Sequence, residues 1–165
     1  SLQPYNQYSG GGDEQYYMNK VADAMIPYLD ANGIAYTRNT PNTSLGQAIR
    51  EALGEKKGIC RFGHFPLPMD ETLVLCAIDL SGRPYLNFQG GFPTERIGQM
   101  DTEMIREFFY AVSYSSMMNL HLKVLDGGNS HHMAEAMFKG FGRALRMAVS
   151  MEPGLSEVWS TKGSL

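Results

Sequence analysis

In the stretch NLHLKVLDGGNSHHMAEAMFKGFGRALRMAVS, residues 119–150, the spacing of the apolar residues changes from alternation to a helical repeat. This change predicts a strand followed by a helix. Residues 119–125 alternate, with leucines and a valine on one side and His121 and Lys123 on the other, as in a half-buried strand. After an Asp-Gly-Gly turn, the apolar residues recur at helical spacing. Two glycines lie inside this helix at a cost of about 1 kcal/mol each relative to alanine. They predict that the helix approaches a sheet closely.

The preceding apolar patterns add strands and helices to this pair. Residues 71–80 and 85–88 are apolar runs on either side of a Ser-Gly-Arg-Pro turn, and they predict a hairpin. A helix capped by Asp101 or Thr102 is expected to follow. The order strand, strand, helix, strand, helix predicts the α+β class, with an antiparallel-tending sheet and the helices packed on one of its faces.

Helical spacing also marks the N-terminal part of the chain. In residues 44–53, Ser44 is expected to cap a helix, Gln47 occupies the capping-box position and Gly54 ends the helix. Residues 14–32 predict an earlier amphipathic helix, followed by a short strand.

Composition excludes some broad classes of function. The net charge of −3 gives no wide cationic surface, so we expect no nucleic-acid partner and no anionic membrane partner. No apolar run approaches the ~20 residues of a membrane span. The two cysteines form neither a metal-type pair nor a disulfide framework, which fits a cytoplasmic location.

The start of the last helix carries a pattern typical of metal ligands. His131 and Glu135 are four residues apart and His132 and Glu135 three apart, so all three are expected on one helical face. Two imidazoles and a carboxylate suit manganese, iron or zinc, and the ligand types alone do not choose among these metals. The alternative is that paired histidines simply cap and solvate a helix start. His121 points away from the apolar face of its strand, toward either a ligand or solvent.

Several segments, taken in order along residues 44–165, closely resemble imidazoleglycerol-phosphate dehydratase, an enzyme of histidine biosynthesis. They are LGQAIREALG (45–54), RFGH (61–64), PMDE (68–71), DLSGRPYL (79–86), LHL (120–122), NSHHMAE (129–135) and STKG (160–163).

The resemblance implies two similar α+β halves, a hollow homo-oligomer and two manganese ions at subunit interfaces. It also implies loss of water from imidazoleglycerol phosphate to give imidazoleacetol phosphate. By this resemblance the metal ligands are His131, His132, Glu135 and, more weakly, His121. The phosphate of the small imidazole substrate would be held by Arg61, Arg83, Ser160 and Lys162, because guanidinium and ammonium groups suit phosphate. From the residues alone, the two arginines are better read as surface charges and the C-terminal residues as an ordinary polar tail.

The N-terminal segment departs from the dehydratase pattern, since it lacks the family's first HHxxE motif. Residues 11–19, 22–29 and 33–39 resemble instead a zinc-dependent N-acetylmuramoyl-L-alanine amidase, whose zinc-binding glutamate would fall on Glu14 or Gln15. The resulting expectation is a chimera, with an amidase-like segment over residues 1–43 and a dehydratase-like half-domain over residues 44–165.

Three functions follow from these resemblances. The first is a hydro-lyase that dehydrates imidazoleglycerol phosphate, with catalysis weak or absent because one metal motif is missing. The second is a fragment of a cell-wall amidase, and the third is a metal-binding or assembly module without catalysis. Bound manganese together with turnover would distinguish the first from the other two.

Overall fold

Four strands form one mixed sheet, in the order β1-β2-β6-β3, in the computed structural model of the chain, which describes residues 44–160. The strands are β1 (Phe62–Met69), β2 (Thr72–Asp79), β3 (Tyr85–Gln89) and β6 (Asn119–Asp126). β2 pairs antiparallel with β1 on one side and with β6 on the other, and β3 runs parallel to β6. The predicted helix 14–32, the strand after it and the amidase-like segment lie outside the described residues.

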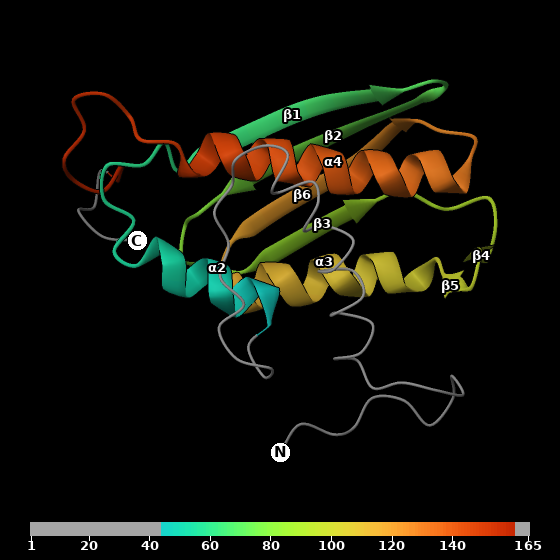
Figure 1. Cartoon of the computed structure of the whole chain (residues 1–165), viewed down its shortest axis with the longest axis horizontal. Coiled ribbons are helices and arrows are strands. Elements are labelled where there is room, and N and C mark those ends of the chain that lie inside the picture. Colours follow the sequence, from blue (N-terminus) through green and yellow to red (C-terminus); the bar gives the residue numbers. More distant parts are fainter. Residues whose placement is uncertain (1–43, 161–165) are drawn as a thin grey trace, which may run out of the picture.

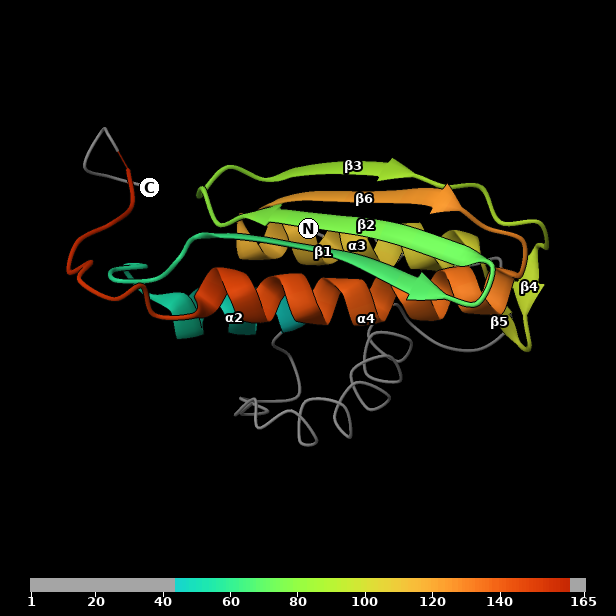
Figure 2. The ribbon, with the colours of Figure 1, turned by 90° about the horizontal axis from the view of Figure 1, so that it is seen from above.

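Helices α3 (Glu103–Ser116) and α4 (Ser130–Val149) lie on one face of this sheet, and α2 (Leu45–Leu53) packs against α3 (Figures 1 and 2). The strict alternation of buried and half-buried residues along β2 reflects this one-sided cover. The α+β class and the placement of helices on one face are therefore confirmed. None of the helices in the described part of the chain is long and apolar enough to cross a membrane.

The predicted hairpin between β2 and β3 is wrong. These strands do not pair, because β6 lies between them and bonds to both. The true hairpin partner of β2 is β1, a strand that the sequence analysis missed because it contains Pro66 and Pro68. Proline lacks the N–H that an inner strand needs on both sides, so a strand with two prolines is confined to the sheet edge. That leaves the inner positions to β2 and β6.

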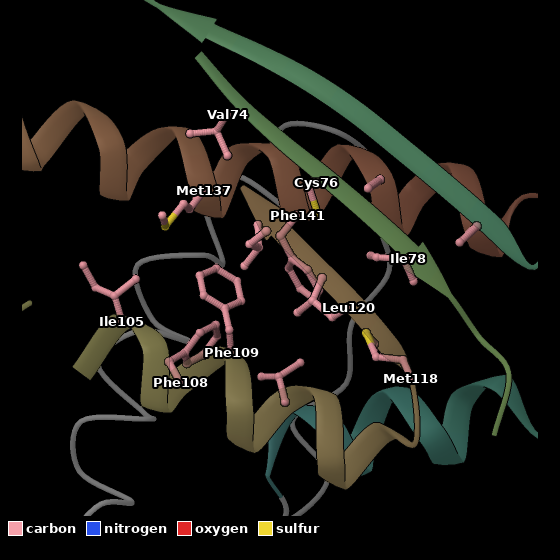
Figure 3. Close-up of a cluster of buried hydrophobic side chains, with 14 of the residues drawn as sticks. Val74, Cys76, Ile78, Ile105, Phe108, Phe109, Met118, Leu120, Met137 and Phe141 are labelled. Atoms are coloured by element: carbon pink, nitrogen blue, oxygen red, sulfur yellow. The ribbon is translucent and has the colours of Figure 1, made fainter. Parts of the chain in front are cut away.

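The core lies between the sheet and the two long helices (Figure 3). Phe109 and Phe141, both fully buried, have ring centroids 5.6 Å apart, and the Phe138 ring lies 4.9 Å from that of Phe109. The backbone of α4 comes close to the sheet, since a Cβ at Gly140 would lie 3.5 Å from the Cβ of Cys76. The close approach predicted from the helical glycines is therefore confirmed at Gly140.

The predicted capping residues lie at the helix ends, but only some of the predicted capping hydrogen bonds form. Ser44 caps α2, its hydroxyl accepting the Gln47 N–H at 3.3 Å, and Gly54 follows the helix end with a positive φ of 47°. The Gln47 amide donates to Glu51 instead of completing a capping box. Thr102 precedes α3 without capping it through its side chain, because its hydroxyl donates to backbone carbonyls of the preceding loop.

Between β3 and α3, two very short strands, β4 (Arg96–Ile97) and β5 (Met100–Asp101), form a small hairpin. This hairpin, the β1–β2 turn and the start of α4 all lie at one end of the molecule (Figure 2). The segment that leads into β4 is bonded to α4, because the hydroxyl of the buried Ser130 accepts hydrogen bonds from the Thr94 N–H at 3.2 Å and from the Thr94 hydroxyl at 2.7 Å.

Candidate metal centre

The first turn of α4 sets the directions of both histidine side chains. Asn129 is the N-cap, and its side-chain oxygen accepts the backbone N–H groups of His131 at 2.9 Å and His132 at 3.3 Å. Its carbonyl also accepts the Met133 N–H at 2.9 Å. The backbone of the HHxxE motif is thereby fixed where an α-helix leaves its first N–H groups without partners.

His131 and Glu135 face each other one turn apart. The His131 Nε2 lies 3.2 Å from a Glu135 oxygen, while Lys139, one turn further along, donates to the other oxygen at 2.5 Å. The hydrogen bond from Lys139 is the main reason that the pKa of Glu135 lies below its usual value; burial acts in the opposite direction, and the charges of Lys139 and of the nearby histidines add smaller lowering effects. Glu135 is therefore an ionised carboxylate near neutral pH, as a metal ligand must be.

His132 turns away from that pair and meets Glu71, at the turn between β1 and β2. Its Nδ1 lies 3.0 Å and 3.3 Å from the two Glu71 oxygens, and its Nε2 lies 3.8 Å from an oxygen of Asp70. The hydrogen bond to His132 is the main reason that the pKa of Glu71 falls to about 2. In return, the bond to Glu71 raises the pKa of His132.

The described residues therefore do not gather His131, His132 and Glu135 into one group. The single group of three with ligand atoms close enough to share a metal ion, within 4.8 Å of one another, is Asp70, Glu71 and His132 among the described residues. His131 and Glu135 meet on one helical face, whereas the His132 ring, whose centroid lies 6.3 Å from that of His131, is directed toward Glu71. Successive helical residues are about 100° apart, so adjacent histidines diverge. The donor types nonetheless fit a divalent transition metal: each imidazole offers a nitrogen, and the carboxylates of Glu71 and Glu135 are ionised near neutral pH.

His121 lies on the sheet face opposite the helices. It pairs with Ala77 of β2 and Asn87 of β3, and its exposed ring lies 5.7 Å from the ring of Tyr85. It is not part of the Asp70, Glu71 and His132 group.

Arg61, one of the predicted phosphate-binding residues, lies far from the HHxxE motif. Arg61 precedes β1, and its backbone N–H donates to the carbonyl of Ala148 near the C-terminal end of α4. Because an α-helix rises 1.5 Å per residue, Arg61 lies about 25 Å along α4 from His131. In a single chain, therefore, one small substrate cannot contact both His131 and Arg61.

Arg61 is held by contacts within the chain. Its guanidinium bonds both oxygens of Asp79, at 2.7 Å and 3.1 Å, and donates to the carbonyl of Trp159 at 2.6 Å. This last bond brings Arg61 beside Ser160, which is half-buried and whose N–H donates to Val158. Arg83 is exposed in the turn after β2, and Lys162 lies outside the described residues.

No role was predicted for Asp70, Glu71, Asn129 or Lys139. For Lys139 a signal was present, since it follows Glu135 by four residues on the same helix. Asp70 and Glu71 belong to the segment PMDE, which resembles the dehydratase family. Their position beside the start of α4 could not be predicted, because it depends on the pairing of β1 with β2.

Comparison with known proteins gives a consistent result. The family model described as imidazoleglycerol-phosphate dehydratase matches residues 35–145, a span that begins inside the segment expected to resemble an amidase. Imidazoleglycerol-phosphate dehydratase of Lachnoclostridium phytofermentans is 56% identical over 138 residues, which cover 84% of this chain and 69% of the relative. The enzyme of Heliobacterium modesticaldum is 57% identical over 122 residues, 73% of this chain and 63% of the relative.

Solved structures agree in fold. The crystal structure of imidazoleglycerol-phosphate dehydratase from Staphylococcus aureus matches with a TM-score of 0.65 at 42% identity, over 66% of this chain and 64% of that one. The Pyrococcus furiosus protein, in complex with (S)-C348, matches with a TM-score of 0.65 at 39% identity, over 73% and 65% of the two chains. The chain thus spans about two thirds of the length of the proteins that it matches.

Proposed function

This chain belongs to the imidazoleglycerol-phosphate dehydratase family, and from that membership we propose that it dehydrates imidazoleglycerol phosphate to imidazoleacetol phosphate in histidine biosynthesis. The observation that carries the proposal is the 56% identity to a dehydratase over 138 residues. A biosynthetic reaction of this kind also supports a cytoplasmic location.

We propose that His131, His132 and Glu135 hold a divalent transition metal, manganese in the first instance, with His121 as a weaker ligand. The ionised Glu135 and the exposed His131 support this assignment. A bound metal ion would supply positive charge that stabilises the substrate imidazole ring as the ring takes up electrons. The chain's own contribution is to orient the imidazole ligands and to keep Glu135 ionised.

We assign binding of the substrate phosphate to Arg61, Arg83, Ser160 and Lys162. The support for Arg61 is its fixed orientation, because Asp79 and the Trp159 carbonyl hold the guanidinium beside the C-terminal segment. A planar, pre-oriented guanidinium is suited to bind a phosphate through two hydrogen bonds.

We further propose that the site is completed between copies of the chain in a homo-oligomer. The distance of about 25 Å along α4 between Arg61 and His131 supports this arrangement, since a substrate with one ring, three carbons and a phosphate is far shorter. In such an assembly, the metal ligands of one copy would meet the phosphate-binding residues of another.

A second candidate is a metal-binding module with little or no turnover, because this sequence carries one HHxxE motif where the resemblance implies two. The amidase alternative depends on residues 1–43 and stays a prediction.

The test measures metal content and turnover on the same sample. The chain is stripped with a chelator, reloaded with manganese and given imidazoleglycerol phosphate, beside His131→Ala and a His64→Ala control on the exposed outer face of β1. We expect wild type and the control to bind manganese and form imidazoleacetol phosphate, and His131→Ala to lose both properties. Stoichiometric metal without product would favour the binding module, and an absence of metal would contradict both proposals.

A further inference from the structure

We propose that Glu71 is a positioning residue for the metal centre: its carboxylate binds the Nδ1–H of His132 and leaves Nε2 as the atom offered to the metal. The inference rests on the proposed function, because it takes His132 as a ligand. Glu71 lies outside the HHxxE motif, on the turn between β1 and β2.

The contact geometry selects the tautomer of the ring. His132 Nδ1 lies 3.0 Å from one oxygen of Glu71 and 3.3 Å from the other. An ionised carboxylate only accepts hydrogen bonds, so the ring nitrogen that faces it must carry the proton. In a neutral imidazole the other nitrogen, Nε2, then has a free lone pair. A hydrogen bond from one ring nitrogen to a carboxylate commonly fixes the tautomer and makes the other nitrogen a more basic ligand.

Glu71 is itself held in place from two elements. One of its oxygens accepts the backbone N–H of Asn129 at 2.9 Å and the hydroxyl of Thr72, at the start of β2, at 3.1 Å. Asn129 is also the residue whose side chain caps α4. The carboxylate therefore connects the hairpin turn to the helix start, and it cannot rotate away from His132 without breaking these bonds.

The same bonds distinguish Glu71 from a direct metal ligand. The oxygen nearest Asn129 already has two donors besides the histidine. On the other side of the ring, Nε2 faces Asp70, whose carboxylate is 3.8 Å away and whose side chain is 77% exposed. The metal-facing side of the ring is thus the side away from Glu71.

The first measurement is the tautomer of His132 in the metal-free full-length chain, from the ring nitrogen shifts in a long-range ¹H–¹⁵N NMR spectrum at a pH where the ring is neutral. We expect the Nδ1–H form in wild type and in Glu71→Gln, whose amide oxygen still accepts. In Glu71→Ala we expect the preference to be lost. A merely structural role of Glu71 would not move this signal, and an Nε2–H ring in the wild type would overturn the proposal.

The second measurement is manganese affinity by titration calorimetry. Glu71→Ala should weaken binding by about 10- to 100-fold, the usual effect of removing a group that orients a ligand, and Glu71→Gln should weaken it less. Glu107→Ala is the matched control, since that carboxylate is 44% exposed against 45% for Glu71 but lies on α3. Unchanged affinity in Glu71→Ala would overturn the positioning role. A wild type that binds no manganese would overturn the proposed function, while the tautomer would still decide whether Glu71 orients His132.

Discussion

Glu71 and His132 stabilise each other's charged forms, so each contributes to stability over its own pH range. The pKa of Glu71 falls from 4.5 to about 2, and its contribution is present above pH 4.5 and lost as the pH falls toward 2. The pKa of His132 rises above 6.5, and its contribution is present below pH 6.5 and lost as the pH rises through the folded value. Their combined effect should be largest between about pH 4.5 and 6.5.

We therefore expect this pair to contribute most to the stability of the metal-free chain against urea within that pH window. The comparison is between wild type and Glu71→Gln at several pH values, with the His132 ring followed by NMR. The midpoint of the His132 titration should move down toward 6.5 in the variant. Identical titration curves in the two proteins would contradict the pairing.

Two arginine–aspartate ion pairs with equal N–O distances test how burial changes the contribution of an ion pair to stability. Both the Arg61–Asp79 and the Arg96–Asp101 contacts measure 2.7 Å, but Asp79 is 25% exposed and Asp101 is 45% exposed. Asp79→Ala leaves a guanidinium that is only 12% exposed without its partner, which should lower the free energy of unfolding by about 1–3 kcal/mol. Asp101→Ala should cost under about 1 kcal/mol. Denaturant unfolding measures both, and equal losses would refute the role of burial.

At the scale of the elements, the contact between β1 and α4 depends on a small residue in the strand. A Cβ at Gly63 would meet the backbone of Ala144 and Ala148, which cannot yield as a flexible side chain would. Gly63→Ala should therefore destabilise the chain by about 1–3 kcal/mol. Gly91→Ala is the control, because its Cβ would enter open space.

Thermal unfolding of these two variants measures the effect. A melting temperature for Gly63→Ala equal to that of the control would mean that β1 moves away from α4 at little cost.

At the scale of the whole molecule, our proposal that the site is completed between copies predicts that assembly depends on metal. Sedimentation should show a larger particle with manganese than after chelation, because a ligand that binds only the assembled form stabilises it by mass action. His131→Ala should remain in the smaller form under both conditions. A particle size independent of both metal and His131 would separate oligomerisation from the metal centre.

The sequence by itself determined the α+β class, the strand at 119–125 and the last two helices, because apolar periodicity depends only on local geometry and on which side is buried. It also determined that the HHxxE motif lies at the start of a helix, because that pattern is local. Only the tertiary structure decided that β6 lies between β2 and β3. Strand order depends on which strands can form hydrogen bonds along both of their edges. The tertiary structure likewise decided that Glu71 meets His132 and that Arg61 lies at the far end of α4, because residues distant in sequence are brought together only by the packing of the sheet against the helix.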